Sequence, residues 1–190
     1  MTPWRITRRG LVGGVAATTA SGLIHRPARA AADPFTLGVA SGEPTADGFV
    51  IWTRLAPDPL SPDGSGGLAG DVSVTWEVAA DEAMRQVVLR GEATAPDRLG
   101  RSVHVELSGL TAGRRYWYRF GALGFRSPVG RARTMGGDRA RLVLSSCAHW
   151  ETGFFSAYRH MADEDPDLVV FLGDYIYEYS YVGARAANTV

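Results

Sequence analysis

The sequence contains no lysine, one cysteine and no long, strongly apolar segment. All 20 basic residues are arginines, which we interpret as a compositional bias without chemical meaning. The single cysteine, Cys147, excludes an internal disulfide bond. An isolated cysteine of this kind is often just a small buried side chain. About 45% of the 190 residues are apolar, which is enough to fill the core of one large domain or two small ones.

Net positive charge is also missing from most of the chain. The first 30 residues carry five arginines and no acidic residue, so the rest has 15 basic and 20 acidic residues, a charge near −5. Binding to a phosphate backbone requires clustered positive charge. We therefore expect no nucleic-acid-binding surface.

Residues 1–32 have the features of an export signal and are excluded from the fold. Arg8 and Arg9 precede a mildly apolar run, Leu11–Ile24, which is too short and too weakly hydrophobic for a stable membrane span. The small–x–small residues 28–30 form a cleavage site. This pattern looks like a twin-arginine signal, with a general secretory signal or an amphipathic lead-in as the alternatives. We expect the twin-arginine export machinery as a partner, and a secreted, periplasmic or cell-surface location.

Residues 33–136 have the pattern of a β-sandwich. In short segments such as Val72–Ala79, apolar and polar residues alternate. Turn-forming residues separate these segments from one another. This spacing predicts a fibronectin type III or immunoglobulin-like sandwich. The predicted strands are Phe35–Ala40, Phe49–Leu55, Val72–Ala79, Val87–Glu92, Val103–Leu107, Tyr116–Phe120 and Val129–Thr134.

One segment of this region predicts a specific structural contact. Residues 107–118 resemble the corner before the sixth strand of a fibronectin type III domain, where a tyrosine hydroxyl bonds back to the chain. Tyr116 is the candidate for that corner. Its role would be structural and not catalytic.

After residue 137 the pattern changes to that of an α/β protein. Arg141–Ser145 predicts a strand, Gly153–Asp165 a helix that ends before Pro166, and Leu168–Leu172 a strand buried on both faces. Strand, helix and strand over about 30 residues predict a βαβ unit with a right-handed crossover. Residues 140–190 are thus expected to be the start of an α/β domain.

Chemically active residues follow both predicted strands. Ligands of open α/β sheets bind beyond the carboxyl ends of the strands. Cys147 follows the first strand, and Asp174 and Tyr177 follow the second. A thiolate, a carboxylate and a phenolate together suit a transition metal, iron in particular. A redox role of the Cys147 thiol is a weaker reading, because no second cysteine supports it.

Three blocks of sequence then carry a family resemblance. Gly173-Asp174-x-x-Tyr177 matches the GDxxY block of purple acid phosphatases, which belong to the calcineurin-like metallophosphoesterases. The usual Asp-x-His opening is missing, and Ser145-Ser146-Cys147 takes its place. Together with Phe35–Pro44 and Val50–Leu55, these blocks resemble the PhoD-like alkaline phosphatases over nearly all of residues 35–180.

This resemblance implies a fold, a metal centre and a reaction. The α/β part would begin a metallophosphoesterase domain, with Cys147, Asp174 and Tyr177 as metal ligands and Asp174 bridging Fe³⁺ and Ca²⁺. The substrate would be a phosphate ester, either a phosphomonoester or a phosphodiester. The metal ions would polarise the phosphoryl oxygens and activate a water.

Other polar residues near these positions have simpler interpretations. We expect a loop role for His149, and Glu178 could support a ligand. Solvated or packed roles are expected for His104 and His160. An acidic, solvated face is predicted for Glu151, Asp163, Glu164, Asp165 and Asp167.

The sequence also predicts that the metal site is incomplete. The family needs further Asn, His and Asp ligands, which are not found up to Val190, so residues 140–190 are expected to be an incomplete domain and residues 1–190 alone inactive. The competing hypothesis is a binding module, in which residues 35–135 recognise a glycan or a protein. That hypothesis predicts an exposed aromatic patch on one face of a sheet and stability without metal.

Overall fold

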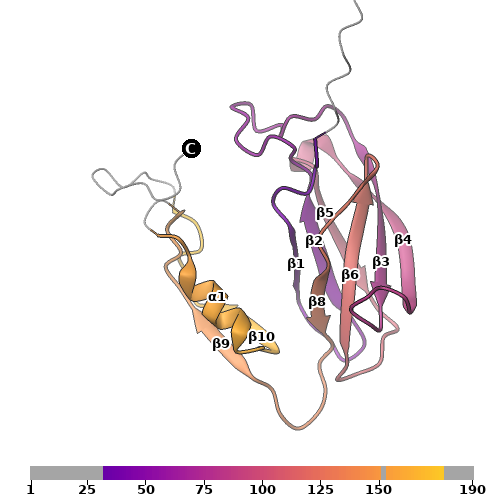
Figure 1. Cartoon of the computed structure of the whole chain (residues 1–190), viewed down its shortest axis with the longest axis vertical. Helices are drawn as coiled ribbons and strands as arrows, with labels where there is room; N and C mark the ends of the chain where they lie inside the picture. The colour runs from indigo at the N-terminus through magenta and orange to yellow at the C-terminus, as the bar shows by residue number, and fades with distance from the viewer. Residues whose placement is uncertain (1–31, 151–152, 178–190) are drawn as a thin grey trace, which may run out of the picture. The chain divides into compact units, whose positions relative to one another are not determined.

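The computed structural model describes residues 32–150 and 153–177. Two antiparallel sheets lie face to face in the first part of this region and form a β-sandwich, and a smaller α/β segment follows (Figure 1). The fold class predicted from the sequence is confirmed. Residues 1–31 of the predicted export signal lie outside the described residues, and the domain boundaries at 32/33, 136 and 140 stay predictions. No helix in the described part of the chain is long and apolar enough to cross a membrane.

The first sheet of the sandwich has three strands. Its central strand β2, Phe49–Arg54, pairs antiparallel with β1, Val39–Gly42, on one side and with β5, Ser102–Leu107, on the other. In β2, alternate residues are buried, because successive side chains of a strand point to opposite faces.

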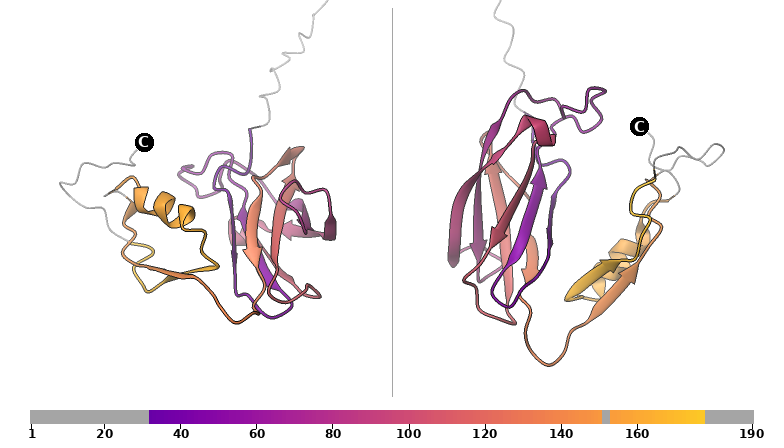
Figure 2. Two further views of the ribbon diagram at one scale, coloured as in Figure 1. Left: turned by 60° about the horizontal axis from the view of Figure 1, so that its bottom comes forward. Right: turned by 180° about the vertical axis from the view of Figure 1, so that it is seen from behind.

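The second sheet is built on β3, Val72–Ala79, and β6, Arg115–Ala122, which pair antiparallel. The long strand β4, Val87–Ala95, flanks β3. On its other side β6 pairs with β7, Phe125–Arg126, and β8, Gly130–Arg133. A 3-10 turn at Asp97–Leu99 connects β4 to β5 in the other sheet, and Figure 2 shows both sheets from two further directions.

The core lies between the two sheets. The side chains of Tyr116, Tyr118 and Phe120 on β6 point inward and are almost fully buried. Tyr118 also hydrogen-bonds the side chain of Ser41, and burial raises the pKa of its phenol to about 12, so the ring stays neutral. The other largest core residues come from both sheets: Phe35, Phe49, Ile51, Leu55, Val74, Val78, Val103 and Leu107.

The prediction for the first strand was wrong by several residues. The Phe35 N–H donates to the side chain of Asp33 (2.9 Å), and the Gly38 N–H donates to the Phe35 carbonyl (2.9 Å). These bonds form a turn, and Gly38 takes a positive φ of 71° that favours glycine. Strand β1 therefore begins only at Val39. The short strand β7 was not predicted.

The tyrosine corner is confirmed. The Tyr116 hydroxyl accepts a hydrogen bond (2.9 Å) from the N–H of Thr111, which lies five residues earlier in the chain. The ring of Tyr116 is 3% exposed and packs near Phe49 of the opposite sheet, with ring centroids 6.3 Å apart. Tyr116 thus joins the loop before β6 to the core.

Replacing Tyr116 by phenylalanine should destabilise the sandwich by about 1–2 kcal/mol, because the Thr111 N–H loses its partner while the ring stays in place. Urea unfolding of the 190-residue chain measures this loss. The control is Tyr175→Phe, whose ring is exposed and outside the sandwich, and which should leave the unfolding free energy unchanged. Equal stability of Tyr116→Phe and the parent would contradict a stabilising role for the corner.

The α/β segment consists of one parallel strand pair and one helix. Strand β9, Leu142–Ser145, pairs in parallel with β10, Leu168–Phe171, so that Leu142 lies opposite Leu168 and Ser145 opposite Phe171. Helix α1, Ser156–Asp163, connects them. The predicted helix ran to Asp165, but Asp165 has a left-handed backbone (φ 49°) and precedes Pro166, which disfavours the helical conformation.

The prediction that the second strand is buried on both faces was wrong for the described residues. Leu168, Val169 and Phe171 are each 37% exposed, and Leu144 of the partner strand is 61% exposed. A strand becomes buried on both faces only when layers cover the two sides of its sheet. In the described part of this segment, one helix accompanies the two-stranded sheet, so two covering layers are not present there.

The acidic face was also predicted incorrectly at two positions. Asp165 forms ion pairs with Arg115 (2.7 Å) on β6 and with Arg131 (2.6 Å) on β8. Asp167 forms an ion pair and a hydrogen bond with Arg133, also on β8. These two carboxylates are therefore bound to arginines of the sandwich and are not freely solvated.

These contacts should make stability depend on pH in the acid range. Hydrogen bonding by Arg115 lowers the pKa of Asp165, and bonding first by the Arg141 N–H and then by Arg133 lowers the pKa of Asp167. A lowered folded-state pKa gives stability that is present above the ordinary value of 3.8 and is lost as the pH falls through the lowered value.

We therefore expect the variant Asp165→Asn/Asp167→Asn to lose less stability than the parent between about pH 6 and about pH 3, because its ion pairs are absent at both pH values. Urea unfolding of both proteins at the two pH values tests this. An identical loss in parent and variant would show that these carboxylates do not contribute.

Candidate metal centre

Two loops meet at the carboxyl ends of β9 and β10. The Cys147 N–H donates to the Gly173 carbonyl (3.2 Å), and the Ala148 N–H donates to the Asp174 carbonyl (2.8 Å). These hydrogen bonds continue beyond the last ladder pair and hold the two loops side by side. The structure thus brings Cys147 and Asp174 together, although 27 positions separate them in the sequence.

The backbone at both residues is unusual. Cys147 has a φ of 59° and Asp174 a φ of 51°, both in the left-handed region that side-chain-bearing residues rarely adopt. Gly173, between β10 and Asp174, has a φ of 143°. A left-handed conformation costs of order 1–3 kcal/mol for a residue with a side chain, as at Cys147 and Asp174, and occurs preferentially at functional sites. Here these conformations turn both side chains toward the same point.

The thiol and the carboxylate are spaced as two ligands of one ion would be. The distance from Cys147 Sγ to Asp174 Oδ2 is 3.4 Å. With metal–sulfur and metal–oxygen bonds of about 2.3 and 2.1 Å, ligand angles between 90° and 109° separate the two atoms by about 3.1–3.6 Å. The donor atoms therefore fit a shared metal ion, and in the metal-free chain the thiol donates a hydrogen bond to the carboxylate.

Tyr177 belongs to the same cluster. Its pKa is raised, most strongly by the hydrogen bond to the Cys147 side chain, then by loss of solvent and by the negative charge of Asp174. Three groups that form anions are thus close together, and a cation among them would favour their charged forms. The donor set predicted from the sequence is therefore brought together, while its role as a metal site stays a prediction.

Neighbouring residues complete the surroundings. The ring of His149 packs against Tyr177, with centroids 4.9 Å apart, which agrees with a role in shaping the loop. Glu178 and Glu151 lie outside the described residues. Within residues 32–150 and 153–177, no three His, Cys, Asp or Glu side chains lie together in positions that could hold a metal ion.

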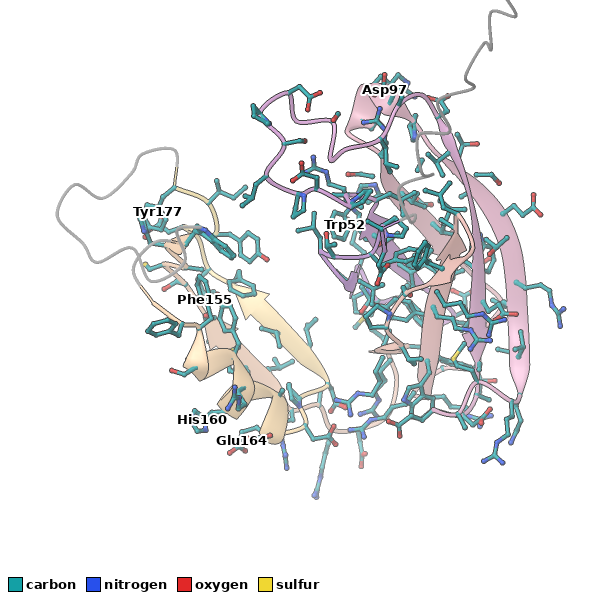
Figure 3. All side chains as sticks on the ribbon, turned by 45° about the horizontal axis from the view of Figure 1, so that its top comes forward. Trp52, Asp97, Phe155, His160, Glu164 and Tyr177 are labelled. Carbon is teal, nitrogen blue, oxygen red and sulfur yellow. The ribbon has the colours of Figure 1, made fainter. Side chains whose placement is uncertain are left out.

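A row of aromatic rings beside the centre was not foreseen from the sequence. Phe155 stacks on Tyr158 (5.3 Å), Tyr158 contacts Phe171 edge-on (6.0 Å), and Phe171 contacts Tyr175 (4.8 Å). In the sequence, only the three-residue spacing of Phe155 and Tyr158, which is typical of one face of a helix, indicated that two of these rings lie side by side. Figure 3 shows Phe155, just before α1, between Tyr177 at one end of the segment and Glu164 at the other.

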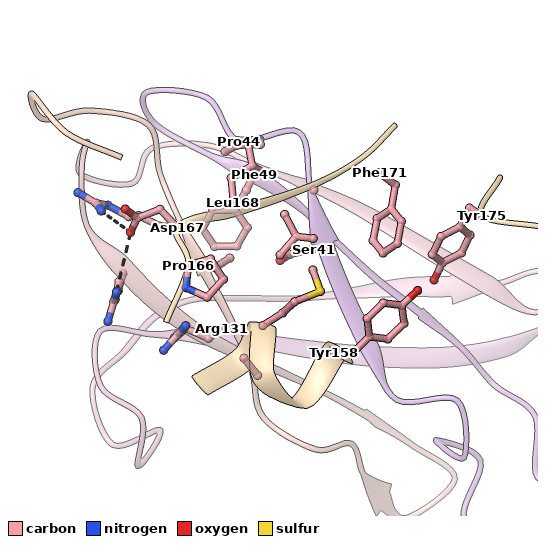
Figure 4. Close-up of a pocket in the computed structure, with 17 residues that line it drawn as sticks. Ser41, Pro44, Phe49, Arg131, Tyr158, Pro166, Asp167, Leu168, Phe171 and Tyr175 are labelled. Atoms are coloured by element: carbon pink, nitrogen blue, oxygen red, sulfur yellow. Dashed lines mark hydrogen bonds and ion pairs between the residues drawn. The ribbon is translucent and has the colours of Figure 1, made fainter. Parts of the chain in front are cut away.

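Three of these rings, those of Tyr158, Phe171 and Tyr175, also line a cavity of about 500 Å³. In Figure 4, Tyr158, Phe171 and Tyr175 lie at one end of this cavity, and Asp167 with its arginine partners lies at the other. Ser41 and Phe49 contribute from the sandwich. The wall is therefore aromatic near the candidate centre and charged far from it.

Comparison with known proteins identifies the family. Residues 18–136 match the PhoD-like phosphatase N-terminal domain, and residues 142–190 match the PhoD-like phosphatase family. The chain belongs to the PhoD-like phosphatases, so the resemblance predicted from the three sequence blocks is confirmed. It is 49% identical over 151 residues to alkaline phosphatase D of Bacillus subtilis (strain 168), a match that covers 77% of this chain and 26% of that protein.

Solved structures agree with this assignment. A structure of PhoD matches with a TM-score of 0.74 and 47% identity, over 79% of this chain and 29% of the matched chain. The sensor domain of the anti-sigma factor RsgI4 from Pseudobacteroides cellulosolvens matches with a TM-score of 0.36 and 14% identity, over 52% and 91% of the two chains. The chain spans about a quarter of the length of its curated relative.

The loop geometry gives a prediction for Gly173. The variant Gly173→Ala should lower the free energy needed to open the hydrogen bonds between the two loops by about 1–3 kcal/mol. Alanine is strained at a φ of 143°, although no atom would contact its Cβ. Hydrogen exchange of the Cys147 and Ala148 amides measures the opening. Gly153→Ala is the matched control, since its added Cβ has ordinary space and its backbone requires no glycine. Unchanged exchange in Gly173→Ala would exclude strain as a constraint on this loop.

Proposed function

We propose that this chain supplies the sandwich and the first ligand loops of a metal-dependent phosphoesterase that hydrolyses phosphate esters. The observation that carries the proposal is the meeting of Cys147, Asp174 and Tyr177 at the carboxyl ends of two parallel strands. Membership of the PhoD-like phosphatases supports the reaction class. Fe³⁺ and Ca²⁺ are the ions that we propose for the centre.

Each of the three residues would have a distinct role in holding the metal ions. The Cys147 thiolate and the Tyr177 phenolate would bind the ferric ion, and the two carboxylate oxygens of Asp174 allow it to bridge both ions. Bound metal ions would supply Lewis acidity for the phosphoryl oxygens and for a water molecule. The cross-loop hydrogen bonds would keep the thiol and the carboxylate in place without further reorganisation.

The proposal extends to where the protein acts and to its substrate. Export through the twin-arginine pathway would deliver a folded enzyme to the cell surface or beyond it, and the substrate would be a phosphomonoester or a phosphodiester. Three donor groups cannot complete the coordination of two ions. We therefore propose that residues 1–190 alone do not hydrolyse phosphate esters.

The alternative of a binding module gains no support from the described sandwich. That hypothesis requires an exposed aromatic patch on one sheet face. Among the described residues, the large aromatic side chains that are exposed are Trp150, Phe154, Phe171 and Tyr175, all in the α/β segment. The exposed large apolar residues of the sandwich are aliphatic. We therefore favour the phosphoesterase.

Adding ferric iron to the 190-residue chain should produce visible absorption, because a phenolate bound to ferric iron absorbs visible light. Tyr177→Phe should abolish the band, while the neighbouring Tyr175→Phe should retain it. Asp174→Asn and Cys147→Ser should weaken iron binding by at least about tenfold, since even residues outside the ligand set cost that much. Absorption spectra and iron titrations of all five proteins test these outcomes.

Two results would contradict the proposal. A visible band that survives in Tyr177→Phe would place the iron at another tyrosine. Iron binding that is equal in the parent, Asp174→Asn and Cys147→Ser would remove the metal centre from this edge of the sheet. Hydrolysis of p-nitrophenyl phosphate or of its bis-ester by residues 1–190 would overturn the expectation that this chain alone is inactive.

A further inference from the structure

Asp167 connects the amino ends of β9 and β10 through both its backbone and its side chain. Its N–H donates to the Arg141 carbonyl (2.9 Å), and its Oδ2 accepts a hydrogen bond from the Arg141 N–H (2.9 Å). Arg141 immediately precedes β9, and Asp167 immediately precedes β10. This pair of hydrogen bonds therefore fixes how the two strands begin relative to each other.

The other carboxylate oxygen of Asp167 is bound to the sandwich. Arg133 donates to Asp167 Oδ1, and Arg115 lies 3.8 Å from the same oxygen. Only 15% of the Asp167 side chain is exposed, compared with 45% for Asp165. Asp167 is thus held from three sides, by β6, by β8 and by the residue before β9.

Apart from backbone hydrogen bonds between the strands and their loops, few contacts among the described residues hold these strands in register. Leu142 and Leu144 on β9 are more than half exposed, and the inter-strand pairing covers four residues. A two-stranded sheet without a buried apolar face is marginally stable in water. Polar contacts at the two ends of the pair therefore have a large share in setting its register.

Register matters because the candidate ligands lie just beyond the other end of the pair. A slip of one residue turns every side chain of a strand to the opposite face and moves the backbone by about 3.3 Å. Either change would separate Asp174 from Cys147, whose side chains are now 3.4 Å apart. The geometry of the centre thus depends on contacts of Asp167, which lies at the other end of β10, seven positions before Asp174.

We propose that Asp167, held by Arg133, is a positioning residue for the candidate metal centre, and that the sandwich uses this contact to keep Asp174 beside Cys147. The inference rests on the proposed function for its chemical meaning, but the strand register that it concerns exists without metal. On this proposal, the sandwich holds β9 and β10 in register through the contact between Arg133 and Asp167.

Hydrogen exchange of the metal-free 190-residue chain tests the proposal. In Arg133→Gln and Asp167→Asn, the Cys147 and Ala148 amides should exchange about fivefold faster, the effect of losing one partly exposed charged hydrogen bond. Arg133→Lys, which keeps the charge, should restore most of the protection. Exchange of the buried β6 amides reports whether the sandwich remains folded.

Arg119→Gln is the matched control. Arg119 forms an ion pair with Glu77 (2.7 Å) on the sandwich and is about as exposed as Arg133, but contacts neither strand of the α/β segment. It should leave the Cys147 and Ala148 amides at the parental rate. The proposal is overturned if these amides keep the parental rate in Arg133→Gln and Asp167→Asn, or if only the Leu168 amide becomes faster.

Iron binding separates this inference from the proposed function. Arg133→Gln should lower the affinity of the chain for ferric iron about fivefold, as measured by titration of the visible band. Arg119→Gln should leave this affinity unchanged. If the parent binds no iron, the proposed function fails, and the exchange experiment still decides whether Asp167 sets the register. If the parent binds iron and Arg133→Gln binds it equally well, Asp167 is not a positioning residue.

Discussion

The parallel pairing of β9 with β10 is the constraint on which the rest of the site depends. Parallel strands end at the same edge of a sheet, so the loop after each strand reaches the same place. Cys147 follows one strand and Asp174 the other, and two backbone hydrogen bonds between the loops complete the approach. An antiparallel pairing of the same two segments would place these residues at opposite ends.

The sandwich and the α/β segment are stabilised in different ways. The sandwich buries aromatic and branched side chains of both sheets in one core, supported by the tyrosine corner. In the described α/β segment many apolar side chains are exposed, and ion pairs from Asp165 and Asp167 to sandwich arginines take a larger share. These ion pairs join the described α/β segment to β6 and β8 of the sandwich.

Errors in the sequence-based predictions have identifiable physical causes. Val72–Ala79 alternates clearly, and its predicted bounds agree with β3. Phe35–Ala40 is apolar as well, but the Asp33 side chain and Gly38 form a local turn there. Asp165 and Asp167 look like a solvated acidic face, because nothing in the local pattern reveals distant arginines. Local patterns predict elements well, and they fail where a side chain finds its partner far along the chain.

The sequence by itself determined the family, the sandwich, the βαβ order and the identity of the candidate ligands, since motif spacing and apolar periodicity are local properties. Only the tertiary structure decided the 3.4 Å approach of Cys147 to Asp174, the left-handed backbone at both residues and the bond from Asp167 to Arg133. The approach and the bond are distances between residues 27 and 34 positions apart. Such distances arise only when the strands pair and the two segments are in contact.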